Sequence, residues 1–170
     1  RNEPQVRQLL FPPVGDGDLG GALKGDLSLV RPEGVGGQPL DQAAALGARL
    51  AILPEMFATG FSMDGHRIAQ PEGGPSETFL RERASTLGLH VLAGVAEAAE
   101  PLPQNRALLV SPDGRVKRYT KIHPFSFAGE ERVMGSGDEV VTWDVEGLRV
   151  TPLVCYDLRF PELYRILALR

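Results

Sequence analysis

Cysteine is almost missing from this sequence, and its scarcity excludes several kinds of protein. With one cysteine among 170 residues, Cys155, the chain cannot build an intrachain disulfide framework. Histidine is also rare, and His66, His90 and His123 are scattered without the spacing of metal ligands. We therefore expect a protein of a reducing compartment, the cytoplasm, that holds no metal ion.

Long apolar runs and a strong excess of charge of one sign are missing too. No apolar run approaches the roughly 20 residues that cross a bilayer. A net charge of −4 gives no reason to expect nucleic acid or an anionic membrane as a partner. The hydrophobic share of 42% and the charged share of 24% are ordinary for a soluble globular domain, so we expect one such domain with its own core.

The first 37 residues show little periodicity and are interrupted by many glycines. We predict that residues 1–37 are irregular or disordered and that the folded domain occupies residues 38–170. Within that domain the pattern predicts helices and strands in the following order: helix 39–49, strand 50–53, helix 76–87, strands 90–95, 106–110 and 115–119, a hairpin of strands 140–143 and 148–154, and a helix from residue 161. This order predicts an α/β layered domain with a mixed sheet.

The cysteine lies at the junction of a predicted strand and a predicted helix. Residues 148–154 are apolar and partly β-branched, and Phe160-Pro161-Glu162 has the composition of a helix start. A side chain on such a turn projects above the sheet, with backbone N–H groups nearby, which suits a nucleophile. The alternative is that Cys155 is a small apolar residue that fills the core.

Two charged residues also follow predicted strands. Glu55 comes directly after the strand 50–53 and Pro54, at the edge where α/β proteins place their sites. Lys121 follows the strand 115–119. The alternatives are a solvated loop glutamate and, for Lys121, a solvated basic face shared with Lys117 and Arg118.

The segments around these three residues resemble the nitrilase superfamily of carbon–nitrogen hydrolases, whose members carry Glu, Lys and Cys in this order. The matching segments are 53–57 (LPEMF), 119–123 (YTKIH) and 153–161 (LVCYDLRFP). Within the superfamily, EMFATGFSMD at 55–64 and CYDLRFP at 155–161 most resemble the omega-amidase branch. The resemblance implies an α-β-β-α sandwich that commonly forms homodimers.

It also implies a role for each residue, and no cofactor. Glu55 is expected to be the general base, Cys155 the nucleophile, and Lys121 the positive charge for the tetrahedral oxyanion, assisted by the backbone N–H of Tyr156. Glu130 is expected to be the second, structural glutamate of the family, in preference to its neighbour Glu131.

The expected substrate is a small molecule with a C–N bond. Omega-amidases act on the terminal amide of small α-keto acids such as α-ketoglutaramate, with release of ammonia. Arg159 is one candidate contact for such an anion, and the alternative is that it forms a structural ion pair beneath the turn. A nitrilase acting on nitriles and a non-catalytic, truncated member that binds or oligomerises remain alternatives. Because family members continue well past the nucleophile, we expect the sandwich to be incomplete in this chain, and the chain alone to fold poorly and be inactive.

Overall fold

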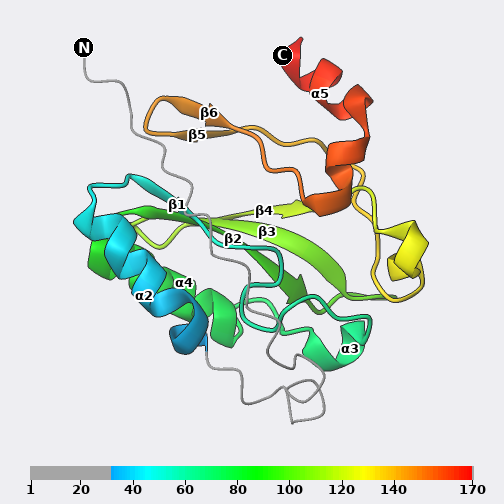
Figure 1. The fold of residues 1–170 in the computed structure, drawn as a ribbon, viewed down its shortest axis with the longest axis horizontal. Helices are drawn as coiled ribbons and strands as arrows, with labels where there is room; N and C mark the ends of the chain where they lie inside the picture. The colour runs from blue at the N-terminus through cyan, green and yellow to red at the C-terminus, as the bar shows by residue number, and fades with distance from the viewer. Residues whose placement is uncertain (1–31, 170) are drawn as a thin grey trace, which may run out of the picture.

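A four-stranded mixed sheet is the centre of the fold (Figure 1). The structure, a computed structural model, describes residues 32–169, so the prediction for residues 1–31 lies outside the described residues. The strands lie side by side in chain order: β1 (Leu50–Ile52), β2 (His90–Glu97), β3 (Gln104–Val110) and β4 (Val116–Thr120). β1 is parallel to β2 and the other pairs are antiparallel, which confirms the predicted mixed sheet.

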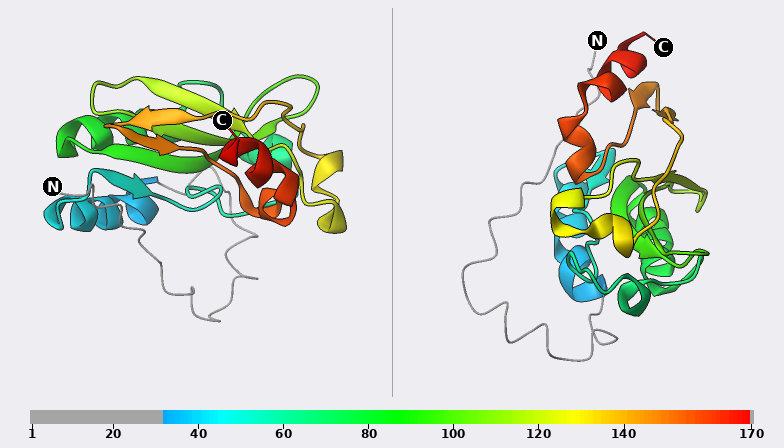
Figure 2. Two further views of the ribbon diagram at one scale, coloured as in Figure 1. Left: turned by 90° about the horizontal axis from the view of Figure 1, so that it is seen from above. Right: turned by 90° about the vertical axis from the view of Figure 1, so that its right-hand side faces the viewer.

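Two helices, α2 (Pro32–Ala45) and α4 (Pro75–Leu87), cover one face of this sheet (Figures 1 and 2). Their buried side chains, among them Leu40 and Leu80, join those of the strands in the main core. α4 ends as predicted at Gly88, which takes the left-handed conformation (φ 64°) with its N–H donating to the Ala84 carbonyl. It begins one residue earlier than predicted, at Pro75, after Gly74.

The start of α2 differs from the sequence prediction. The helix begins at Pro32 and contains Pro39, so residues 32–37 are helical and not irregular. Packing explains the difference, because a Cβ at Gly36 would lie 3.0 Å from the Phe79 ring and 3.3 Å from Leu53. Glycine lets the helix approach the core closely here, and this tertiary contact outweighs its low helix propensity.

A hairpin of β5 (Trp143–Val145) and β6 (Leu148–Val150) covers the opposite face of the sheet. Trp143 and Val145 are buried there in a second core cluster with side chains of the main sheet. The hairpin turns at Glu146-Gly147, as predicted, with both residues at positive φ. Helices, sheet and hairpin therefore form an α-β-β arrangement of layers, as the nitrilase-type sandwich requires.

The hairpin strands are shorter than predicted. Residues 140–142 and 151–154 belong to no strand, although the Thr142 and Thr151 hydroxyls share a hydrogen bond (3.0 Å), and Pro152 lacks the N–H that a ladder needs. Cys155 therefore follows a short unpaired segment. The remaining elements are α3 (Gly65–Ile68), α5 (Pro161–Ala168) and the 3₁₀ helices η2 (Ser126–Ala128), η3 (Glu130–Arg132) and η4 (Cys155–Arg159). None of the helices within residues 32–169 is long and apolar enough to cross a membrane.

Gly94 on β2 brings the Glu55 segment directly onto the sheet. The Gly94 N–H donates to the Pro54 carbonyl (3.1 Å), and the Phe57 N–H donates to the Gly94 carbonyl (3.0 Å). A Cβ at this position would lie 2.6 Å from the Glu55 Cα and 2.8 Å from the Met56 nitrogen. The absence of a side chain at Gly94 thus sets the position of Glu55 relative to β2.

We predict that Gly94→Ala lowers the free energy of unfolding by about 1–3 kcal/mol, because the added methyl group meets backbone that cannot move aside cheaply. Denaturant unfolding measures this change. Gly37→Ala is the matched control, because a Cβ there meets nothing within 4 Å and the position is helical. We expect it to be neutral or slightly stabilising. Equal stability of Gly94→Ala and the parent would show that the contact is not tight.

Candidate active site

Lys121 is the residue around which the charged groups gather. It follows β4, its side chain is almost fully buried, and its Nζ donates to Glu55 Oε1 (2.9 Å) and to Glu130 Oε2 (2.8 Å). The alternative of a solvated basic face is therefore wrong for Lys121. Burial opposes the charged form, but the hydrogen bonds to Glu130 and Glu55 outweigh it and raise the pKa of the ammonium above its usual value. Lys121 is a fixed positive charge.

Glu130 is the buried member of its pair of neighbouring glutamates. It has no exposed surface, whereas Glu131 is exposed, and its role as the structural glutamate stays a prediction. Besides Lys121, it accepts the backbone N–H of Phe125 (2.6 Å). This bond folds the loop after β4 back over the lysine, so that Glu130 holds both the cation and the loop beside it.

Asn105 on β3 was not found by sequence reasoning. Its Nδ2 donates to Glu55 Oε1 (2.7 Å) and to Glu130 Oε1 (2.9 Å), and its backbone carbonyl accepts the backbone N–H of Lys121 (2.9 Å). Asn105 is 1% exposed. The signal that could have identified Asn105 was a polar amide next to the apolar run 107–110. The strand predicted from the sequence began at residue 106 and so left residue 105 out. Asn105 therefore bridges the carboxylates of Glu55 and Glu130, as the ammonium of Lys121 also does.

The two oxygens of Glu55 have different surroundings as a result. Oε1 accepts from both Lys121 and Asn105, and the side chain keeps 19% of its surface exposed. Neither of these donors bonds the second oxygen, which is therefore available to the thiol of Cys155. After desolvation, the charge of Glu55 is the largest cause that raises the pKa of this thiol. The structure thus gives Glu55 one anchored oxygen and one available oxygen.

Cys155 lies at the start of η4 with a strained backbone. Its φ is 47°, in the left-handed region that is uncommon for a residue other than glycine. The residue is exposed, so it does not fill the core. Partial desolvation, and next the negative charge of Glu55, raise the pKa of the thiol, while Lys121 lowers it by less. A raised pKa keeps the thiol protonated at neutral pH, so it needs a base when it attacks.

A cleft of about 200 Å³ joins Glu55 and Cys155. Its other walls are mainly apolar and come from the sheet and from the segment before the cysteine, including Ile52, Leu53, Leu92, Gly94, Leu153 and Val154. A small molecule in this cleft contacts the carboxylate and the thiol together. Among residues 32–169, no group of three or more His, Cys, Asp or Glu side chains is arranged to hold a metal ion.

The two remaining predicted residues lie on η4. Tyr156 follows the cysteine directly, and its ring packs edge-on against Phe125 (centroids 5.1 Å apart) and Phe160 (5.4 Å). Arg159 is exposed and does not line the cleft. It forms no ion pair with another described residue, so the alternative of a structural ion pair finds no support in this part of the chain.

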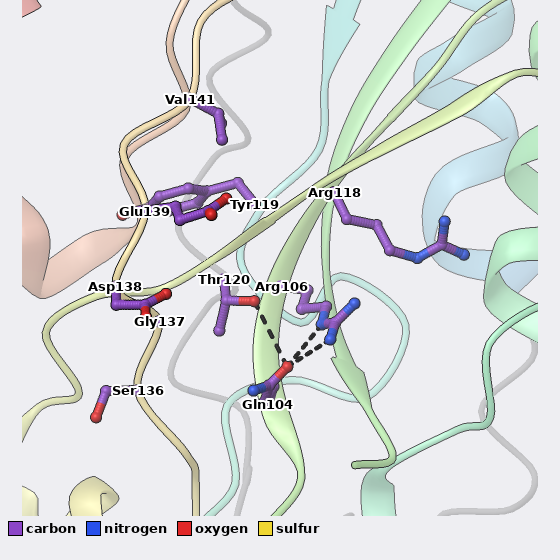
Figure 3. Close-up of a pocket in the computed structure, with 10 residues that line it drawn as sticks. All are labelled: Gln104, Arg106, Arg118, Tyr119, Thr120, Ser136, Gly137, Asp138, Glu139 and Val141. Atoms are coloured by element: carbon purple, nitrogen blue, oxygen red, sulfur yellow. Dashed lines mark hydrogen bonds between the residues drawn. The ribbon is translucent and has the colours of Figure 1, made fainter.

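A second cavity of similar volume lies along the edge strand β4 and holds none of these residues (Figure 3). Gln104, Arg106, Arg118 and Thr120 line it, together with the segment 136–139. Its arginines already have partners, because Arg106 pairs with Glu97 (2.8 Å) and Arg118 bonds Glu97 and Glu77. The arginines that line this cavity therefore belong to a structural ion-pair network.

Comparison with known proteins decides the family. Residues 34–170 match the carbon-nitrogen hydrolase family. The chain belongs to this family. It is 43% identical over 112 residues to omega-amidase YafV of Yersinia enterocolitica, covering 65% of this chain and 43% of the relative. It is 36% identical over 138 residues to a nitrilase of Pyrococcus abyssi, covering 77% and 52%.

A solved structure of this carbon-nitrogen hydrolase family gives the same fold. XC1258 of Xanthomonas campestris, a CN-hydrolase superfamily protein with an arsenic adduct in the active site, superposes with a TM-score of 0.66 at 35% identity. The match covers 74% of this chain and 50% of that one. The chain thus spans about half the length of the relatives that it matches.

The surroundings of the thiol make a pH prediction. Replacing Glu55 by Gln removes a charge that raises the pKa of Cys155 and leaves Lys121, which lowers it. The midpoint of iodoacetamide alkylation should therefore move to lower pH in Glu55→Gln and to higher pH in Lys121→Met, measured as rate against pH from about 6 to 11. Glu131→Gln, at the exposed neighbour of Glu130, should leave the midpoint unchanged. An upward movement in Glu55→Gln would contradict this account of the thiol.

Proposed function

We propose that the protein hydrolyses the carbon–nitrogen bond of a small amide through a thioester on Cys155, with release of ammonia. The observation that carries the proposal is the buried ion pair of Lys121 with Glu55 beside an exposed thiol in one cleft. Membership of the carbon-nitrogen hydrolase family and 43% identity to an omega-amidase support it. As the match covers half of the relatives, the activity of the whole protein is part of the proposal.

In the first half of the reaction, the sulfur of Cys155 attacks the amide carbonyl carbon. The thiol proton passes to the available oxygen of Glu55 as the C–S bond forms. Two N–H groups of the Lys121 ammonium are used by carboxylates, which leaves the third for the oxyanion. With the backbone N–H of Tyr156 it stabilises the tetrahedral intermediate, and such donors contribute about 3 kcal/mol each.

The intermediate collapses when the C–N bond breaks. Glu55 returns its proton to the leaving nitrogen, ammonia departs, and the acyl group stays on the sulfur. In the second half, Glu55 takes a proton from water and the resulting hydroxide attacks the thioester. The C–S bond breaks to give a carboxylic acid, and Glu55 returns the proton to the departing sulfur, which regenerates the thiol. Glu130 and Asn105 keep Lys121 and Glu55 in place through both halves.

The substrate class that we propose is the terminal amide of a small α-keto acid. The segments 55–64 and 155–161, which resemble the omega-amidase branch, and the omega-amidase relative support this choice. Such a substrate carries a carboxylate that needs a positive partner. Arg159 stays a prediction for this contact. Its side chain has no ion pair with another described residue, which leaves its charge available, but it does not line the cleft.

A nitrilase is the second candidate, because a relative with that name is 36% identical. The same thiol, base and cation can act on a nitrile carbon. A non-catalytic member is the third alternative, and the intact arrangement around Lys121 speaks against it.

The cytoplasmic location and the homodimer expected from the sequence are also part of this proposal. Exposed apolar side chains near the chain's end, Leu158, Tyr164, Ile166 and Leu169, support association.

The test is ammonia release from α-ketoglutaramate, and from a nitrile of matched length, by the intact protein. We predict faster turnover of the amide. Cys155→Ala should abolish it, and Glu55→Gln and Lys121→Met should each lower kcat/KM by about 100-fold or more, because each removes a group needed in the transition state.

Lys117→Met is the matched control for Lys121→Met, because Lys117 is exposed on β4, the strand that Lys121 follows. It should retain parental activity. Faster turnover of the nitrile would favour the second candidate. Ammonia release that survives Cys155→Ala would overturn the proposed mechanism.

A further inference from the structure

Asp157 is a buried acidic residue two positions after the nucleophile. Its carboxylate has no exposed surface, and no role follows for it from the reaction described above. Oδ2 accepts the hydroxyl of Tyr119 (2.8 Å) and the backbone N–H of Val154 (3.0 Å). Burying a carboxylate is costly unless donors surround it, so its contacts are the reason that the structure tolerates it.

The other oxygen of Asp157 reaches the segment after β4. Oδ1 accepts the backbone N–H of His123 (2.8 Å) and lies 3.1 Å from Nδ1 of the same residue. The His123 ring stacks on Phe160, with centroids 3.5 Å apart and an angle of 9° between the planes. The two segments are therefore held together by the carboxylate and by this stacked pair.

The positions of these contacts in the sequence matter. On one side, Tyr119 and His123 flank Lys121 at a distance of two residues each. On the other side, the Val154 N–H and the Asp157 side chain flank Cys155. The buried side chain of Asp157 thus joins residues on both sides of the lysine, Tyr119 through its hydroxyl and His123 through its backbone N–H, to the turn that carries the cysteine.

The donors to Asp157 are permanent. Burial, and next the hydrogen bond to Asp157, raise the pKa of Tyr119 far above its ordinary value, so its hydroxyl keeps the proton that it donates. Backbone N–H groups do not titrate. The strained, left-handed backbone of Cys155 (φ 47°) follows directly after one of these bonds, and such strain persists only where the surroundings hold it.

We propose that Asp157 is a positioning residue, which joins the Tyr119–His123 segment to the Val154–Asp157 turn and so holds the sulfur of Cys155 beside Glu55 and Lys121. Asp157 does not contact the reacting atoms. It acts through the turn, and reactions that need three groups in one geometry lose rate steeply when one of them shifts. The expected loss of turnover rests on the proposed function. The expected change in the titration of the Cys155 thiol does not.

Asp157→Asn tests the role, because asparagine has the same shape but one oxygen. Its single oxygen can accept either from Tyr119 and Val154 or from His123, and its N–H₂ group then meets a backbone N–H donor at the other position. We expect kcat to fall about 100-fold, with KM within about threefold, because binding in the cleft survives while the geometry of attack is lost.

The alkylation of Cys155 gives a second readout that needs no substrate. Released from Glu55, the thiol should titrate nearer its ordinary value, so the midpoint of iodoacetamide alkylation moves to lower pH while turnover falls. A merely structural residue would not produce this opposite pair of changes. Asp144→Asn is the matched control. Asp144 also accepts a backbone N–H, from Gly147 (3.1 Å), but in the exposed hairpin, and both readouts should stay parental.

Parental kcat and a parental midpoint in Asp157→Asn would overturn the proposal. If that variant loses its cooperative unfolding transition, Tyr119→Phe decides, since it removes one hydrogen bond and keeps the ring. A lower midpoint in Tyr119→Phe supports the role of Asp157, and an unchanged one contradicts it. If the parent protein hydrolyses neither amide nor nitrile, the proposed function fails, while the alkylation comparison still tests the role of Asp157.

Discussion

The ammonium of Lys121, buried between the carboxylates of Glu55 and Glu130, is the interaction on which the rest of the site depends. A buried cation is costly unless several acceptors surround it, and removal of one partner leaves an uncompensated charge. Two acidic residues far apart in the sequence, Glu55 in the turn after β1 and Glu130 at the start of η3, are therefore required at this point. The sheet brings Glu55 and Lys121 together, because Glu55 follows β1 and Lys121 follows β4. Asn105, on the intervening strand β3, bonds Glu55.

This arrangement gives the two glutamates different tasks. Glu130 is fully buried, and both of its oxygens are occupied by Lys121, Asn105 and the Phe125 N–H. Glu55 is partly exposed and has one oxygen occupied twice. The glutamate with an available oxygen is the one in the cleft with the thiol. Burial and the count of donors thus separate a structural carboxylate from one that can move a proton.

The residues that sequence reasoning found share a local signal. Glu55, Lys121 and Cys155 each follow a recognisable apolar run, and their flanking segments resemble one family. The mixed sheet, the Glu146-Gly147 turn and the start of α5 at Pro161 were also local patterns of turn and cap residues. Such features could be predicted because the residues that cause them are neighbours in the chain.

The residues that sequence reasoning missed act through partners distant in the chain. Asn105 bonds Glu55 from 50 positions away, and Asp157 bonds Tyr119 from 38 positions away, so neither role is visible in a local pattern. The early start of α2 depends on Gly36 fitting against Phe79, again a tertiary contact. The predicted strand through Val154 failed for a local reason that was available, because Pro152 cannot donate to a ladder.

The central claim is that Cys155 carries the acyl group of an amide substrate during turnover. The most direct measurement mixes the intact protein with α-ketoglutaramate, quenches the reaction in acid within the first turnovers, and locates any added mass by peptide mass spectrometry. The account predicts an acyl adduct on the peptide that contains Cys155, removed by hydroxylamine as a thioester is. Ammonia release with no adduct, or with an adduct on another residue, would contradict it.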